Sequence, residues 1–247
     1  MSDRSFDKRE AVLLSEEYGL KADFHTHASD DPAETLSYSS EMLIRQAADR
    51  GIDVLSIVGH GSMVFTDRLG EYAENHGVLL VPGVELSIEG KHVLLLNPNR
   101  EQLTVKTFAD LRSCKGCDEV VVAPHPFYPS PHSLGRELIR HIELFDAIEL
   151  CAFHMPFLRC NERAKKVAER FRKPMIATTD THTLPYAPRA YTLVRSKRDV
   201  CSILEAIRHM RITPKVEQPS MVAAYAAVFR MLRCNLKDSF CRISKER

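Results

Sequence analysis

The chain alternates short apolar runs with amphipathic segments along most of its 247 residues. The apolar runs are rich in Val, Ile and Leu and are bounded by Gly, Pro or Asp, so we expect them to form buried strands. These expected strands are 52–58, 77–88, 91–96, 119–124, 146–150 and 174–179. Strands that alternate with helices along a chain predict a mainly parallel sheet or barrel.

Amphipathic segments between these runs predict the helices. The segment 40–51 has apolar residues on one side, and it lies between Ser40, the expected N-cap, and the C-terminal glycine Gly51. Further helices are expected over residues 158–171 and from Asp199 onward, where apolar residues recur at steps of three and four.

The end of the sequence carries a different pattern, a stripe of apolar residues at alternating steps of three and four. We expect residues 1–215 to form one domain and residues 216–247 to form a helical extension. This extension packs on its own domain or forms a homodimer contact, and the sequence leaves both alternatives open. The stripe consists of Val222, Tyr225, Phe229, Leu232 and Leu236.

The overall charge and the ends of the chain exclude several classes of protein. Lys and Arg total 34 and Asp and Glu total 33, so no overall basic field is available to hold a long nucleic acid duplex. A small anionic substrate remains compatible with this balance. The N-terminus lacks an apolar signal region and no apolar run is long enough to cross a bilayer, so we expect a cytoplasmic protein without a membrane partner.

The seven cysteines predict reduced thiols, because their number is odd and their spacing irregular. Cys114 and Cys117 form one CxxC pair, but no second pair follows that would complete a structural zinc site. We therefore interpret them as a pair of loop thiols.

Polar residues at the ends of the expected strands carry the chemistry. His25 and His27 form an HxH pair, and alternate residues of a strand point to the same side, so both imidazoles can bind one ion. The carboxyl ends of parallel strands converge on one face, where divalent cations would satisfy imidazoles and carboxylates together. The set contains no thiolate, which suits Zn, Mn or Fe. The other members are His60, Glu85, His92, His125, Asp180 and His182.

The ordered series of motifs resembles the PHP (polymerase and histidinol phosphatase) family of metal-dependent phosphoesterases. The motifs are "DFHTH", "SIVGH", "PGVEL", "APHP" and "TTDTH", and they span Asp23 to His182. The resemblance implies a distorted (β/α)7 barrel with two or three divalent metal ions at the carboxyl ends of its strands.

The resemblance also implies which residues hold each ion. His25 and His27 would bind one ion with Asp180, and Glu85 would bridge to a second ion that His92 and His125 bind. His60 and His182 would bind a third ion with one further acid, for which Asp30 or Asp31 is available and Asp31 is preferred. Gly59 stands where many relatives have an aspartate, which predicts a weaker support for His60. His154 matches no ligand position, and His132 is interpreted as an ordinary surface or helix residue.

The family chemistry implied for this chain is direct hydrolysis of a phosphate mono- or diester by a hydroxide that bridges two metal ions. Asp180 would belong to the catalytic centre, and His182 or His60 would help the leaving oxygen to depart. Arg189 would bind a phosphate oxygen of the substrate. The expected substrate is a small phosphorylated metabolite, a nucleotide or a short oligonucleotide.

Two alternatives remain open at this stage. An amidohydrolase also uses HxH at a barrel strand, although such enzymes often bridge their metals with a carboxylated lysine, and Glu85 stands in that position here. The second alternative is a metal-binding scaffold domain with weakened catalysis, because resemblance in fold alone does not prove activity.

Overall fold

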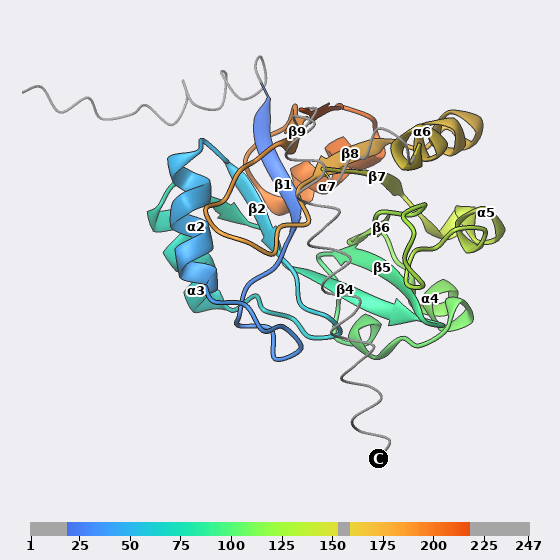
Figure 1. The fold of residues 1–247 in the computed structure, drawn as a ribbon, viewed down its shortest axis with the longest axis horizontal. Coiled ribbons are helices and arrows are strands. Elements are labelled where there is room, and N and C mark those ends of the chain that lie inside the picture. Colours follow the sequence, from blue (N-terminus) through green and yellow to red (C-terminus); the bar gives the residue numbers. More distant parts are fainter. Residues whose placement is uncertain (1–18, 153–158, 218–247) are drawn as a thin grey trace, which may run out of the picture.

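The computed structural model describes residues 19–152 and 159–217, whose strands form two mixed sheets. Figure 1 shows helices α2 and α3 on one side of the strands and α4, α5 and α6 on the other. The strands are β1 (Leu20–Thr26), β2 (Val54–Ile57), β3 (Leu79–Leu80), β4 (Gly83–Ile88), β5 (Lys91–Leu96), β6 (Val120–Ala123), β7 (Ala147–Cys151), β8 (Met175–Thr178), β9 (Ala190–Val194) and β10 (Ile212–Val216). The helices are α2 (Ser40–Asp49), α3 (Asp67–Asn75), α4 (Phe108–Cys114), α5 (Glu137–Arg140), α6 (Cys160–Phe171) and α7 (Val200–Arg208), with 3₁₀ turns at Gln102–Thr104 and Ile142–Leu144.

The first sheet has the order β10-β9-β1-β2-β3 and the second has the order β4-β5-β6-β7-β8. Both sheets mix parallel and antiparallel pairs, so the fold is mixed α/β and the expected (β/α)7 barrel is not confirmed. One physical reason lies between β4 and β5. Glu89 and Gly90 have positive φ angles of 49° and 76°, which close a two-residue turn and make these strands antiparallel.

The two sheets meet at the carboxyl ends of their parallel strands. Isolated bridges join Thr26 to Thr181 and His60 to Glu85. The amide of Asp180 donates to the carbonyl of His25 at 2.9 Å, and the amide of Glu85 donates to the carbonyl of Gly59 at 3.0 Å. Motifs that are far apart in the sequence are therefore tied together through their main chains.

Most expected elements are present, with shifted ends. The expected strand 77–88 is divided into β3 and β4, because Pro82 lacks the amide that a continuous ladder needs. Helix α2 has Ser39 as its N-cap instead of Ser40, since the Ser39 hydroxyl accepts from the amide of Met42. The predicted helical extension lies, apart from residues 216 and 217, outside the described residues.

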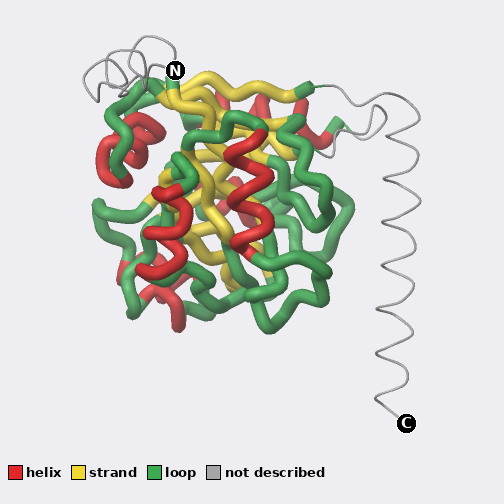
Figure 2. The backbone as a smooth tube through the Cα atoms, turned by 90° about the vertical axis from the view of Figure 1, so that its left-hand side faces the viewer, coloured by secondary structure: helices red, strands yellow, loops and turns green. Residues whose placement is uncertain are grey.

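Within residues 19–152 and 159–217, three main clusters of buried apolar side chains form the core. One lies between the second sheet and α4, α5 and α6, a second lies between the two sheets and α7, and a third lies under α2 and α3. Figure 2 shows this arrangement from the side, with strands inside and helices outside. None of the described helices is long and apolar enough to cross a membrane.

Candidate metal centre

Every strand-end motif identified in the sequence contributes to one cluster of imidazoles and carboxylates. Among the described residues, four groups of three side chains bring their ligand atoms within 4.8 Å of one another. The groups are His25, His27 and Asp180; His27, His60 and Glu85; His27, Glu34 and His182; and Glu85, His92 and His125. Groups that share a member overlap, so the cluster is one continuous centre.

The HxH pair and Asp180 form the most buried group. His25 Nε2 and His27 Nε2 are 3.1 Å apart, and Asp180 Oδ1 lies 3.5 Å from the first and 3.3 Å from the second. Two neutral imidazole nitrogens at this separation can share only one proton. A divalent cation would instead accept the lone pairs of both rings and the carboxylate, so this donor set fits a metal ion.

Glu85 stands at the middle of the centre, and imidazole nitrogens from five histidines surround its carboxylate. Oε1 lies 2.8 Å from His92 Nδ1 and 3.3 Å from His125 Nε2. Oε2 lies 3.1 Å from His60 Nε2, 3.6 Å from His25 Nε2 and 3.8 Å from His27 Nε2. A carboxylate whose two oxygens face different sets of nitrogens has the geometry to bridge two ions.

Electrostatics within the centre keep Glu85 charged. Burial alone would raise its pKa, but the charge of His25 and hydrogen bonds from His125 and His60 hold the pKa well below its usual range. For His27, burial outweighs the hydrogen bond to Asp180 and lowers the pKa to about 4. The ring of His27 is therefore neutral at pH 7, the state in which an imidazole can bind a metal.

Glu34 is a member of the centre that sequence reasoning missed. Its Oε1 lies 3.5 Å from His182 Nε2 and 3.4 Å from His60 Nδ1. It belongs to the loop between β1 and α2, which gives no periodic signal from which its position can be predicted. The structure places Asp31 outside the four groups, behind His60, and Asp30 caps the start of α2 by accepting from the Ser40 amide at 2.6 Å.

Glu149 is a second residue that sequence reasoning passed over, and it supports two members of the centre. It is fully buried in β7, where its Oε1 lies 2.9 Å from His25 Nδ1 and accepts from the Thr178 hydroxyl. Its other oxygen accepts from the amide of His125, a residue with a positive φ of 29°. A carboxylate on Nδ1 leaves Nε2 of His25 facing the centre.

Asp23 fixes the loop that carries Asp180. Its buried carboxylate accepts from the Thr179 amide at 3.1 Å, the Thr179 hydroxyl at 2.6 Å and the Tyr186 hydroxyl at 2.8 Å. Burial raises the pKa of Asp23 to about 6 in spite of these hydrogen bonds, which lower it. Asp180 has a positive φ of 48°, a conformation that persists only when its surroundings hold it.

His92 and Arg189 are two further positions that the sequence predicts. His92 stacks on His132, with ring centroids 4.9 Å apart and an angle of 17° between the planes, so His132 limits the rotation of His92. Arg189 is exposed just before β9. Because β9 runs antiparallel to β1, Arg189 lies toward the end of β1 that carries the HxH pair. Its guanidinium forms no ion pair with a described residue.

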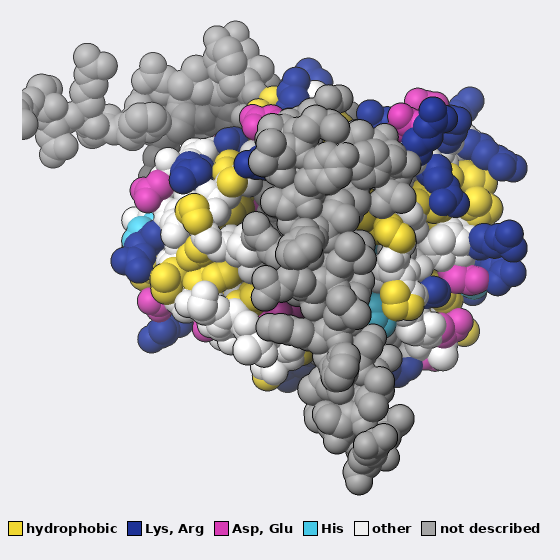
Figure 3. Space-filling model, viewed as in Figure 1, with side chains coloured by type: hydrophobic (Ala, Val, Ile, Leu, Met, Phe, Trp, Pro, Cys, Tyr) yellow, Lys and Arg dark blue, Asp and Glu magenta, His cyan; other side chains and the backbone are white. Residues whose placement is uncertain are grey.

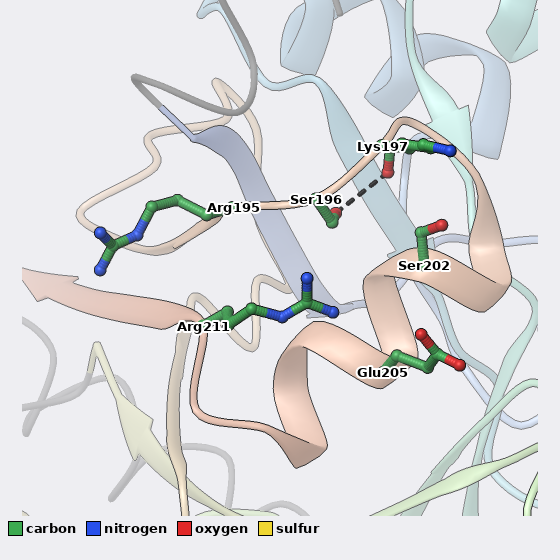
Figure 4. Close-up of a pocket in the computed structure, with 6 residues that line it drawn as sticks. All are labelled: Arg195, Ser196, Lys197, Ser202, Glu205 and Arg211. Carbon is green, nitrogen blue, oxygen red and sulfur yellow. Dashed lines mark hydrogen bonds between the residues drawn. The ribbon is translucent and has the colours of Figure 1, made fainter. Parts of the chain in front are cut away.

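A separate pocket of about 440 Å³ lies between the loop after β9, helix α7 and the start of β10. In Figure 4, Arg211 points toward α7, whereas Arg195 and Lys197 point away from each other. Pairing of Val194 with Leu20 puts this pocket at the amino-terminal end of β1, opposite the HxH pair. It is therefore not part of the candidate centre. Its lining residues are Arg195, Ser196, Lys197, Ser202, Glu205 and Arg211.

The CxxC pair does not join a metal group of described residues. Cys114 ends α4 and Cys117 is exposed in the following loop, and both are free thiols. This agrees with the interpretation of the pair as loop thiols.

Comparison with known proteins gives one family match and several similar folds. The family model described as PHP-associated matches residues 159–212, a segment that contains Asp180 and His182. No curated protein matches the sequence significantly.

Three solved structures illustrate the likeness in fold. PsfC from Pseudomonas syringae has a TM-score of 0.62 and 18% identity, over 89% of this chain and 99% of that one. A protein from Bifidobacterium adolescentis, assigned as a metal-dependent phosphoesterase, has a TM-score of 0.55 and 16% identity, over 67% of this chain and 90% of that one. The lesion-specific endonuclease Q of Pyrococcus furiosus has a TM-score of 0.55 and 16% identity, over 80% of this chain and 57% of that one. One segment of the chain thus matches the PHP-associated family model, and the chain as a whole shares its fold with these three proteins.

Proposed function

We propose that the chain is a metal-dependent phosphoesterase that hydrolyses a phosphate mono- or diester. The observation that carries this proposal is the position of Glu85, a buried carboxylate with nitrogens of five histidines within 3.8 Å. Such a site offers ligands for more than one divalent ion without a thiolate, which suits Zn, Mn or Fe. The metal-dependent phosphoesterase assignment of a protein with a similar fold supports the same chemistry.

The groups of described residues suggest how the ions divide. His25, His27 and Asp180 would hold one ion, and His92 and His125 a second, with Glu85 between them. His182 and Glu34 would hold a third, a position for which the sequence favoured Asp31. When bound, two such ions would activate a water molecule and neutralise charge on the phosphate oxygens.

The protein's own residues position these groups and move protons. Glu149 holds the ring of His25 and the backbone amide of His125 in place, so little reorganisation is needed when a substrate binds. His182 is the most exposed histidine of the centre at 37%, so we expect it to donate a proton to the leaving oxygen when no third ion is bound to it. His60 is the second candidate for this role. Arg189 would bind a phosphate oxygen from the rim of the centre.

A small phosphorylated metabolite, a nucleotide or a short oligonucleotide is the proposed substrate. The near-neutral charge of the whole chain supports this choice, since tight binding of a long duplex needs many cations. The small substrate also requires no contact beyond the centre and its rim.

A nucleic acid strand is the second candidate, and one surface favours it. Exposed cations gather on and just after α6, and Figure 3 shows them as a group of Lys and Arg side chains over this helix. Endonuclease Q, one of the proteins of similar fold, has been solved with a 27-mer duplex. This chain spans just over half the length of that protein. The cations are Arg163, Lys165, Lys166, Arg170 and Arg172.

A screen with the metal-loaded protein tests the proposed function. Generic phosphomonoesters, phosphodiesters and a short single-stranded oligonucleotide would be incubated with protein loaded with Mn²⁺, Zn²⁺ or Fe²⁺. We expect hydrolysis by the native protein and a loss of about 10³-fold in Asp180→Asn, because a ligand is weakened while the fold is kept.

The matched control for this screen is Glu119→Gln. Glu119 is also a buried carboxylate, but it accepts from the amide of Gly116 at 2.7 Å, outside the candidate centre. Equal activity in native protein and Asp180→Asn would rule out the assigned centre. Binding of metal without hydrolysis of any ester would favour the scaffold alternative. Neutralisation of Lys165 and Lys166 should weaken cleavage of the oligonucleotide only, if the second candidate is right.

A further inference from the structure

The carboxylate of Asp31 contacts both the backbone and the ring of His60. Its Oδ2 accepts from the His60 amide at 2.7 Å and lies 3.2 Å from His60 Nδ1. Its Oδ1 accepts from the Ser62 hydroxyl at 3.0 Å and from the Ala33 amide at 3.1 Å. The Asp31 side chain is fully buried, so these four contacts fix its position.

Glycine at position 59 leaves the space that this arrangement occupies. A Cβ on Gly59 would lie 3.1 Å from Asp31 Cγ and 2.7 Å from both the carbonyl and hydroxyl oxygens of Ser62. Carbon and oxygen atoms do not approach to 2.7 Å in a packed interior, so a side chain here would displace the Ser62 turn or Asp31. The acid that the sequence lacks beside His60 is thus supplied from the loop after β1.

His60 Nδ1 has a second acidic neighbour, which raises the question of which acid controls the ring. Glu34 Oε1 lies 3.4 Å from Nδ1, but only Asp31 is placed with the N–H···O geometry of a hydrogen bond. On the opposite side of the ring, Nε2 lies 3.1 Å from Glu85 Oε2.

We propose that Asp31 is a positioning residue that keeps His60 protonated at Nδ1 and leaves Nε2 free to bind an ion beside Glu85. A carboxylate that accepts from one ring nitrogen fixes the tautomer and makes the other nitrogen a better ligand. Glu34 then remains available to the group formed with His27 and His182. This inference rests on the metal binding of the proposed function and not on its hydrolysis step.

Histidine NMR decides which nitrogen carries the proton. The protein would be labelled with ¹⁵N-histidine and loaded with Zn²⁺, and the His60 signals would be identified by their loss in His60→Gln. We expect a proton on Nδ1 and a zinc-shifted Nε2 in the native protein. Glu34→Gln should keep the hydrogen-bonded Nδ1–H signal, and Asp31→Asn should abolish it. A proton on Nε2, or an Nδ1–H signal that is lost in Glu34→Gln and kept in Asp31→Asn, would overturn the proposal.

Metal binding gives an independent measurement. Asp31→Asn should weaken the ion beside His60 by about 10-fold to 100-fold in Zn²⁺ titrations, the range typical of outer carboxylate supports, and leave the other ions unchanged. Glu119→Gln serves as the matched buried carboxylate and should titrate like the native protein. Unchanged affinity in Asp31→Asn, or equal weakening of every ion, would contradict the positioning role.

The tautomer of His60 can be measured even if a variant does not fold or no zinc binds. If Asp31→Asn does not fold, the spectra of the native protein and of Glu34→Gln still show which nitrogen of His60 is protonated. If no zinc binds, the proposed function fails, and the tautomer can still be measured in the metal-free protein at a pH where the ring is neutral.

Discussion

The two sides of the candidate centre are built in different ways. On the inner side, made of His25, His27, Glu85, His125 and Asp180, side chains are between 0% and 13% exposed. On the outer side, made of Glu34, His60 and His182, exposure is 17% to 37%. The inner residues lie in or beside strands whose main chains are paired, whereas Glu34 and His182 lie in loops. We infer that the inner side is preorganised and binds ions more tightly than the outer side.

The largest expected effect is at Glu85, the residue that both sides share. Glu85→Gln removes the charge that faces five imidazoles, so ions on both sides should be lost and activity should fall by about 10³-fold, the effect of removing a strong electrostatic stabiliser. Metal analysis after gel filtration and a phosphodiester assay measure the two effects. Loss of ions from one side alone would show that Glu85 does not join the two sides.

The second effect should show whether the two sides bind their ions independently, and it concerns Glu149, which supports the inner side. Glu149→Gln removes the charge behind His25, so the inner ions should bind about 10-fold to 100-fold more weakly while the outer ion is unchanged. Asp31→Asn should weaken binding of the outer ion and leave the inner ions unchanged. Zn²⁺ titrations of both variants, with melting curves of the metal-free proteins to check folding, make the comparison. Weakening of both sides by either variant would contradict independent supports.

A smaller effect is expected at Glu34. Glu34→Gln should lower the metal content by one ion and reduce kcat by about 10-fold to 100-fold, with the inner ions retained. Metal analysis beside steady-state kinetics tests this, and Glu41→Gln provides an exposed carboxylate control on the neighbouring helix α2. If Glu34→Gln still binds every ion, the acid that holds the third ion is a residue other than Glu34.

The inner side could be predicted from the sequence because its residues stand in strand-end motifs. An HxH pair after an apolar run fixes both the direction of the rings and their location at the carboxyl end, and "TTDTH" does the same for Asp180. The antiparallel β4–β5 pair was less predictable. Its two-residue turn, Glu89 and Gly90, is not a strong hairpin dipeptide such as Asn-Gly or Asp-Gly, so the alternation of strands and helices favours parallel strands here.

The supports and the outer acid could not be predicted because they depend on contacts across the fold. Glu149 is one acid inside an apolar strand, and only the tertiary structure shows that it meets His25, 124 residues earlier in the chain. Asp31 and Glu34 lie three residues apart in one loop with similar chemistry. Which of them faces His182 is decided by the backbone turns of this loop, where the Glu34 amide donates to the Asp31 carbonyl at 3.0 Å.

The last expected effect is a pH dependence of the outer ion, and it follows from His182. Burial would lower the pKa of His182, but the hydrogen bond to Glu34 and the charge of Asp180 raise it to about 9. In the metal-free protein the charged ring therefore stabilises the fold below about pH 6.5, and this contribution is lost as the pH rises through about 9. An ion that binds His182 must first displace its proton.

The outer ion should consequently bind about tenfold more tightly for each pH unit between about 7 and 9, as expected for release of the His182 proton. His27 has a pKa of about 4 and releases no proton in this range, whereas nearby carboxylates raise the pKa of His25 and His125, so inner ions displace protons from those two rings. Zn²⁺ titrations in two buffers of different ionisation enthalpy count the protons released per ion. Melting curves add a sign test, because the metal-free protein should lose stability with rising pH while the loaded protein gains it. A pH-independent outer affinity would mean that the ion does not bind through His182.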